Sequence, residues 1–203
     1  MKDSEEIITS LLKLCRRIKE ISERDFIILN EVQLGKKVKF DDWSISDCLK
    51  HNILIIENYL SKVEMALSGR DVSLLKNNGT GFRSGFLGNY FVKSVKLKED
   101  NSVVKMYRTS RFLNPISTED LVNHVVKQFI QSTDRIINIL KQLEEVNLES
   151  ISIPMPGLPF VRLRLGDMLC YIVYHIERHF VQALRTYIEI SFQNKNDFEL
   201  LNQ

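Results

Sequence analysis

Two histidines lie four residues apart near the C-terminus of the chain, His175 and His179 in the segment YIVYHIERHFVQALRTY. On an α-helix, residues i and i+4 are neighbours on one face, so both imidazoles would point the same way. Another of the four histidines, His51, lies in an earlier segment with helical spacing. Three imidazoles that meet in the fold would bind a transition metal and leave one coordination position open, as catalytic metal sites do.

The same pair has a simpler interpretation. Histidines with i, i+4 spacing also occur on ordinary helix surfaces, where each ring is partly buried and satisfied by a hydrogen bond. The position of His51 favours a metal site, because it lies at the edge of its apolar stripe, as His175 and His179 do in theirs. The fourth histidine, His124, falls on the polar side of its segment, and we expect it at the surface.

The residues around the histidines narrow the chemistry. Residue 176 is Ile, so the chain lacks the His-Glu-x-x-His pattern of zinc proteases, which carries its own general base. Glu177 is expected to point away from both histidines. Asp47, one turn before His51, is a candidate to support the site by accepting a ring N–H. Cys48, three residues before His51, is interpreted as a core residue rather than a metal ligand.

The composition predicts one globular domain. The chain has 203 residues, 44% of them hydrophobic and 27% charged, with a net charge of +2. This balance argues against a nucleic acid partner, which a strongly basic domain would favour. The acidic N-terminus does not resemble a signal peptide, and no apolar run reaches the roughly 20 residues of a membrane span. The odd number of cysteines predicts reduced thiols and a cytoplasmic protein, with Cys15 and Cys170 in the core.

Hydrophobic periodicity predicts an all-α fold, a four-helix bundle with a long connection between its second and third helices. We expect the four helices at about residues 3–29, 44–68, 118–145 and 165–192. Ser44 is expected to cap the second helix, with Asp47 in its first turn and with Trp43 packed on Cys48. Ser117 or Thr118 is expected to cap the third.

The connection at residues 69–117 is the least regular part of the chain. Residues 86–95 favour a short helix, although residues 91–97 and 103–108 could instead form a hairpin. A connection of this length often covers a functional site. Its cluster of basic residues is typical of a solvated loop, or alternatively of an anion-attracting rim over the metal site: Lys93, Lys96, Lys98, Lys105, Arg108 and Arg111. Three prolines exclude helix from the loop before residue 165: Pro154, Pro156 and Pro159.

Three segments in this order resemble the DinB/YfiT-like superfamily: WSISDCLKHNILIIENYL, RFLNPISTEDLV and LRLGDMLCYIVYHIERHFVQALR. The resemblance spans nearly the whole chain and implies one DinB-like domain over residues 1–203, folded as an up-down-down-up bundle. It implies a divalent metal, often zinc or nickel, held by His51, His175 and His179. It also implies a homodimer, and an enzyme that uses a low-molecular-weight thiol such as bacillithiol or mycothiol.

The expected function is therefore that of a metal-dependent thiol transferase with a small-molecule substrate. Arg178 and Gln182 are candidates to orient that substrate. Two alternatives stay open: a hydrolase in which the same metal activates water, and a non-catalytic interaction protein in which the metal joins two helices. The chain has no Gly-x-Ser-x-Gly elbow and no phosphate-binding loop, so nothing supports serine or nucleotide chemistry.

Overall fold

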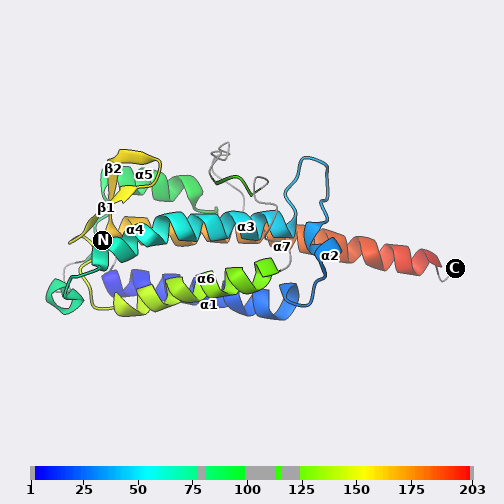
Figure 1. Cartoon of the computed structure of the whole chain (residues 1–203), viewed down its shortest axis with the longest axis horizontal. Coiled ribbons are helices and arrows are strands. Elements are labelled where there is room, and N and C mark those ends of the chain that lie inside the picture. Colours follow the sequence, from blue (N-terminus) through cyan, green and yellow to red (C-terminus); the bar gives the residue numbers. More distant parts are fainter. Residues whose placement is uncertain (1–2, 77–80, 99–112, 116–123, 202–203) are drawn as a thin grey trace.

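The computed structural model describes residues 3–76, 81–98, 113–115 and 124–201, and this part of the chain is mostly helical (Figure 1). Within these ranges no helix is both long enough and apolar enough to span a bilayer. The helices are α1 (Ser4–Ile21), α2 (Glu31–Gly35), α3 (Ile45–Ile55), α4 (Ser61–Leu67), α5 (Phe86–Val95), α6 (Val125–Gln142) and α7 (Leu165–Leu201). A hairpin of β1 (Ser152–Met155) and β2 (Leu158–Arg164) precedes α7. A π-helical segment, Ile56–Leu60, joins α3 to α4, and a second, Ser22–Phe26, follows α1.

Four long helical segments pack along one another: α1, α3 with α4, α6 and α7 (Figure 1). Helices α1 and α7 run in the same direction. The start of α1 and the first turns of α7 line the same cavity, so the two helices begin at the same end of the bundle. Beyond the end of α1, Phe26 packs on Phe180 and Tyr187, with ring centroids 5.5 and 5.8 Å apart. Both partners lie further along α7, as a parallel arrangement requires.

The other two segments run the opposite way. Early in α3, His51 lies beside His175, whereas Tyr59 further along packs on Tyr171, so the residue numbers of α7 fall as those of α3 and α4 rise. Helix α6 starts near Phe180, and the chain after its end meets the start of α7, where Gly166 donates a backbone hydrogen bond to Leu148. Helix α3 is therefore antiparallel to α7, which places a histidine of each at the same level.

The start of α3 follows from its sequence. The Ser44 hydroxyl accepts a hydrogen bond from the Asp47 amide at 3.1 Å, and the Asp47 carboxylate accepts one from the Ser44 amide at 3.0 Å. This reciprocal capping satisfies two backbone donors that the first turn leaves open. The predicted cap is thus confirmed, and it fixes where α3 begins relative to His51. All three cysteines are free and buried, as the sequence predicts.

The region before α7 differs from the prediction, because residues 152–164 form a hairpin rather than an irregular loop. Pro154 lies in β1 and Pro159 in β2. Each strand of a two-stranded ribbon has one free edge, so a residue without an amide donor is tolerated there. Gly157 at φ 77° makes the turn, in a conformation that glycine adopts at little cost.

The connection after α4 contains the expected short helix, α5, which confirms the helical alternative for residues 86–95. The first helix ends earlier than predicted, and the short helix α2 lies in the segment after it. The described part of α6 begins at Val125. Several predicted features lie outside the described residues: the alternative strand at 103–108, the caps at Ser117 and Thr118, and the side chains of Lys105, Arg108 and Arg111.

Helix α5 is fixed to the start of α7 through one carboxylate. Asp167 is 1% exposed, and it accepts hydrogen bonds from the Ser84 hydroxyl and, at 2.9 Å, from the Gly85 amide. Gly88 lies directly over this carboxylate, and a Cβ atom at residue 88 would come 2.0 Å from Asp167 Oδ2. The absence of a side chain at Gly88 therefore sets how closely α5 approaches α7.

Candidate metal centre

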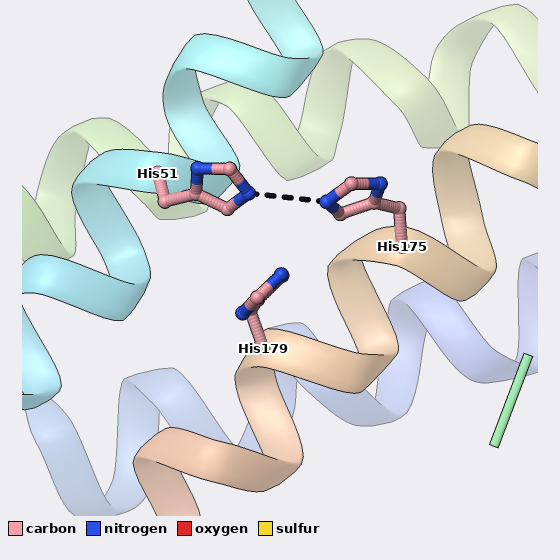
Figure 2. Close-up of side chains that lie close together, drawn as sticks. All are labelled: His51, His175 and His179. Atoms are coloured by element: carbon pink, nitrogen blue, oxygen red, sulfur yellow. Dashed lines mark hydrogen bonds between the residues drawn. The ribbon is translucent and has the colours of Figure 1, made fainter. Parts of the chain in front are cut away.

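The structure brings together the three histidines that the sequence singled out. His51 comes from α3, and His175 and His179 from successive turns of α7 (Figure 2). One nitrogen of each ring lies within 4.8 Å of the others. Among the described residues, this is the one group of His, Cys, Asp and Glu side chains close enough to hold a metal ion. The fourth histidine, His124, is exposed, as expected.

The hydrogen bonds of two histidines fix which ring nitrogen carries the proton. His51 Nδ1 lies 2.7 Å from the carbonyl oxygen of Leu113, and His179 Nδ1 lies 3.2 Å from Oε1 of Gln182. Both oxygens can only accept, so each Nδ1 carries the hydrogen and each Nε2 keeps a free lone pair. Outer acceptors of this kind orient the histidines of metal sites and make them better ligands.

The third histidine, His175, is only partly satisfied. Its Nε2 lies 3.0 Å from Nε2 of His51, which has a lone pair, so His175 must donate in this contact (Figure 2). Its Nδ1 is buried and has no hydrogen-bond partner in the part of the chain that the structure describes. A buried polar atom without a partner is unfavourable and calls for an explanation.

The spacing of the two Nε2 atoms fits a shared metal ion. Two imidazole nitrogens bound tetrahedrally to one zinc ion lie about 3.3 Å apart, because each Zn–N bond is about 2.0–2.1 Å long. The observed 3.0 Å between His51 and His175 is a few tenths of an ångström shorter. The residues therefore fit a divalent ion with little movement, and three protein ligands would leave a position open.

Burial keeps the three imidazoles neutral. Desolvation lowers the pKa of His51, lowers that of His175 well below its ordinary value and lowers that of His179 to about 3. The other imidazoles and the nearby positive charge of Arg178 act in the same direction on His175 and His179. Metal ligands must be deprotonated, so at neutral pH protons do not compete for these nitrogens.

Aromatic rings form the surroundings of the triad. The Trp43 ring lies 5.0 Å from the ring of His51 and 5.2 Å from that of His179. Tyr171 meets His175 edge-on at 5.5 Å. The sequence identified Trp43 only as a partner of Cys48 at the helix start. Its contact with two imidazoles was missed, because no sequence spacing relates residue 43 to residue 179.

The supporting role predicted for Asp47 is wrong. Its carboxylate caps α3 and lies 3.7 Å from Lys37 Nζ, while the N–H of His51 is taken by Leu113. Glu177 is also outside the triad: its charge acts on Cys15, and the nearby charge of Lys96 acts on the Glu177 carboxylate. The triad therefore has no carboxylate ligand among the described residues.

The cysteine near the site is a core residue, as predicted. Cys48 is 0% exposed, and burial raises the pKa of its thiol. A thiol that holds its proton is a poor ligand and a poor nucleophile. Any thiol chemistry at the triad would therefore need a thiol from outside the chain.

The two candidate orienting residues have different places. Gln182 holds the ring of His179, so it acts on a triad histidine directly. Arg178 donates to the carbonyl of Ser94 at the end of α5, across 3.3 Å. Its charge also lowers the pKa of all three histidines, which places a cation close to the triad.

A cavity of about 730 Å³ lies between α1, α5 and α7, and none of the three histidines lines it. One face of α5 lines it with Asn89, Val92 and Lys93, and Lys96, directly after the helix, lines it too. Phe91, on another face of α5, packs instead on Tyr171 next to the triad. Lys93 and Lys96 therefore border this cavity, which does not support the alternative that they form a rim over the metal site.

A scan against protein-family models, a search of the curated proteins and a search of the solved structures find no match to this chain.

Proposed function

We propose that the chain is a DinB/YfiT-like four-helix bundle in which His51, His175 and His179 bind a divalent metal, zinc or nickel. We further propose that it is a metal-dependent transferase that uses a low-molecular-weight thiol. The observation that carries the proposal is the convergence of three neutral imidazoles, two of them held by outer hydrogen-bond acceptors. The helix directions support the bundle, since α1 and α7 run one way and α3 and α6 the other.

The donor set favours an anionic sulfur ligand. A bound divalent ion would act as a Lewis acid and lower the pKa of a thiol at its open position. Three neutral imidazoles leave the charge of such an ion uncompensated, and Arg178 adds a further positive charge nearby. The triad has no carboxylate among the described residues to serve as a general base for water. A thiol, which is far more acidic than water, needs such a base less.

The test combines metal content, binding and turnover. Protein purified without an affinity tag should contain a divalent metal, and chelation should remove both the metal and the conjugation of a thiol to 1-chloro-2,4-dinitrobenzene. His175→Ala should lower metal affinity by more than about 100-fold, because even outer-shell substitutions reach that range. His124→Ala, at an exposed histidine outside the triad, should change neither the metal affinity nor the rate of conjugation. Wild-type protein that binds no zinc, nickel or cobalt would overturn the proposal.

One observation favours a structural role as a second candidate. The triad joins α3 to α7, and His51 is only 2% exposed, so a metal would link two helices of the core. In that case metal removal should lower the unfolding midpoint strongly, and no thiol or ester substrate should turn over.

Metal-dependent hydrolysis without thiol would instead favour the hydrolase. Size-exclusion chromatography with light scattering tests the homodimer that the resemblance implies.

A further inference from the structure

A buried hydrogen bond joins the two helices that carry the triad. Asn52 follows His51 on α3, and Ile176 follows His175 on α7. The side-chain amide of Asn52 donates to the carbonyl oxygen of Ile176 at 3.1 Å, and Asn52 is 0% exposed. The bond therefore connects α3 and α7 one residue beyond each of the two histidines whose Nε2 atoms are 3.0 Å apart.

Both helices also bury apolar residues in the core, and apolar packing alone defines the position of one helix along another less strictly than a directional bond does. Leu49 and Ile53 on α3 and Ile172 and Ile176 on α7 are all buried in the core. Interlocking apolar ridges can repack after a shift of one turn, which is about 5.4 Å along a helix. A shift of that size would separate His51 from His175. A buried polar bond disfavours it, because the shifted helices would leave its donor without a partner.

Stability alone does not explain an asparagine at this position. The other polar atom of its side chain, Oδ1, is buried and has no hydrogen-bond partner among the described residues. Desolvating this oxygen is unfavourable, and leucine has the same branched shape and number of side-chain heavy atoms without a polar atom to desolvate. Burying the Asn52 amide is therefore unfavourable for stability. Its role is better explained by how it positions the neighbouring histidines.

We propose that Asn52 is a positioning residue, whose bond to the Ile176 carbonyl holds α3 and α7 in the register that brings His51 to His175. The inference rests on the proposed metal site. Its test therefore reads metal affinity and imidazole geometry rather than activity.

The test compares Asn52→Leu with a matched control, Thr133→Val. Thr133 is also buried, at 1% exposure, but its hydroxyl donates to Phe129 within the same helix, α6. Asn52→Leu should lower the affinity for Zn²⁺ and Co²⁺ by about 10–100-fold, the range of outer-shell substitutions. It should also alter the visible spectrum of bound Co²⁺, while the metal-free protein unfolds at the wild-type temperature or above. Thr133→Val should keep the wild-type affinity and spectrum.

A second measurement needs no metal. In the metal-free wild type, ¹⁵N NMR should detect the proton shared between His51 and His175 through their Nε2 atoms, and Asn52→Leu should lose it. If wild type shows this proton but binds no metal, the proposed function fails while the register is still tested. If Asn52→Leu keeps both the shared proton and the wild-type affinity, the inference is overturned. Should Asn52→Leu not fold, Asn52→Ala is judged by the same two measurements.

Discussion

Nδ1 of His51 donates a hydrogen bond to the carbonyl oxygen of Leu113, 62 residues further along the chain, across 2.7 Å. Leu113 lies in the connection between α5 and α6, so this connection contributes a backbone atom to the site. The bond decides the protonation of His51 and, through the shared contact, that of His175. The acceptor is a backbone atom, and the buried side chain of Leu113 packs in the core and so fixes its place.

The hydrogen bonds predict one tautomer for each histidine of the metal-free protein. His51 and His179 should carry their protons on Nδ1, and His175 should carry its proton on Nε2. Long-range ¹H–¹⁵N correlation spectra of the imidazoles at neutral pH distinguish the two forms. An Nε2-protonated His51 would contradict the described site.

Removal of the Gln182 amide should weaken metal binding without unfolding the protein. Gln182→Ala frees the ring of His179, and loss of such an outer partner typically costs about 10–100-fold in metal affinity. Competition with a chelator of known affinity measures the effect. Gln142→Ala, at an exposed glutamine at the end of α6, is the control and should bind as tightly as wild type.

Stability of the metal-free protein should fall on mild acidification. The ordinary histidine pKa is near 6.5, but it is lowered in the fold for all three triad residues, to about 3 for His179. Below about pH 6.5 the histidines of the unfolded chain bind protons, whereas those of the folded triad stay neutral. The stabilisation is complete above that pH and decreases toward pH 3, by up to about 1.4 kcal/mol per pH unit for each histidine.

Urea unfolding between pH 7.5 and 5.5, above the usual range of carboxylates, measures this slope. His179→Gln should reduce the slope, since one of the three groups with a lowered pKa is lost. His124→Gln should leave it unchanged. A free energy of unfolding that is constant over this range would show that the triad histidines are not held neutral.

The single tryptophan of the chain should report metal binding. The Trp43 ring centroid lies 5.0 and 5.2 Å from those of His51 and His179, so the indole is close to the triad. Co²⁺, Ni²⁺ and Cu²⁺ have partly filled d shells that quench indole fluorescence at short range, whereas Zn²⁺ does not. Titration with Co²⁺ should therefore quench the emission, and excess Zn²⁺ should restore it. If Co²⁺ binds but does not quench the Trp43 emission, the ion binds away from the triad.

Gly88→Ala should destabilise the protein through Asp167. The added Cβ would come 2.0 Å from Asp167 Oδ2, so either the Asp167 side chain or α5 must move. Overpacking of this kind typically costs about 1–3 kcal/mol, which thermal or urea unfolding detects. Gly35→Ala is the control, because a Cβ atom there meets nothing within 4 Å. If both variants match wild type, α5 is not held to α7 as described.

Periodicity predicted the helices well, because each long helix buries one stripe of its own residues. The same argument placed His51, His175 and His179 at the edges of two stripes, and these edges do face each other. The hairpin at residues 152–164 was missed, since prolines exclude helix but do not by themselves distinguish a loop from a strand with a free edge.

The supporting residues of the site were less predictable, because their partners are remote in sequence. Asp47 lies one helical turn from His51, so it was the predicted acceptor for the imidazole N–H. In the structure that N–H donates to the Leu113 carbonyl instead. Nothing in the sequence around Asn52 indicates its hydrogen bond to the Ile176 carbonyl, 124 positions later. Helical spacing relates residues within one element, whereas these contacts depend on how separate elements dock.

The antiparallel docking of α3 on α7 has a consequence for the order of folding. His175 and His179 become neighbours as soon as one turn of α7 forms. His51 lies 124 positions before His175 and joins them only after a long loop has closed. A C-terminal fragment that begins after residue 51 would therefore present two imidazoles of the triad and never three. The complete triad therefore forms only once α3 has docked on α7.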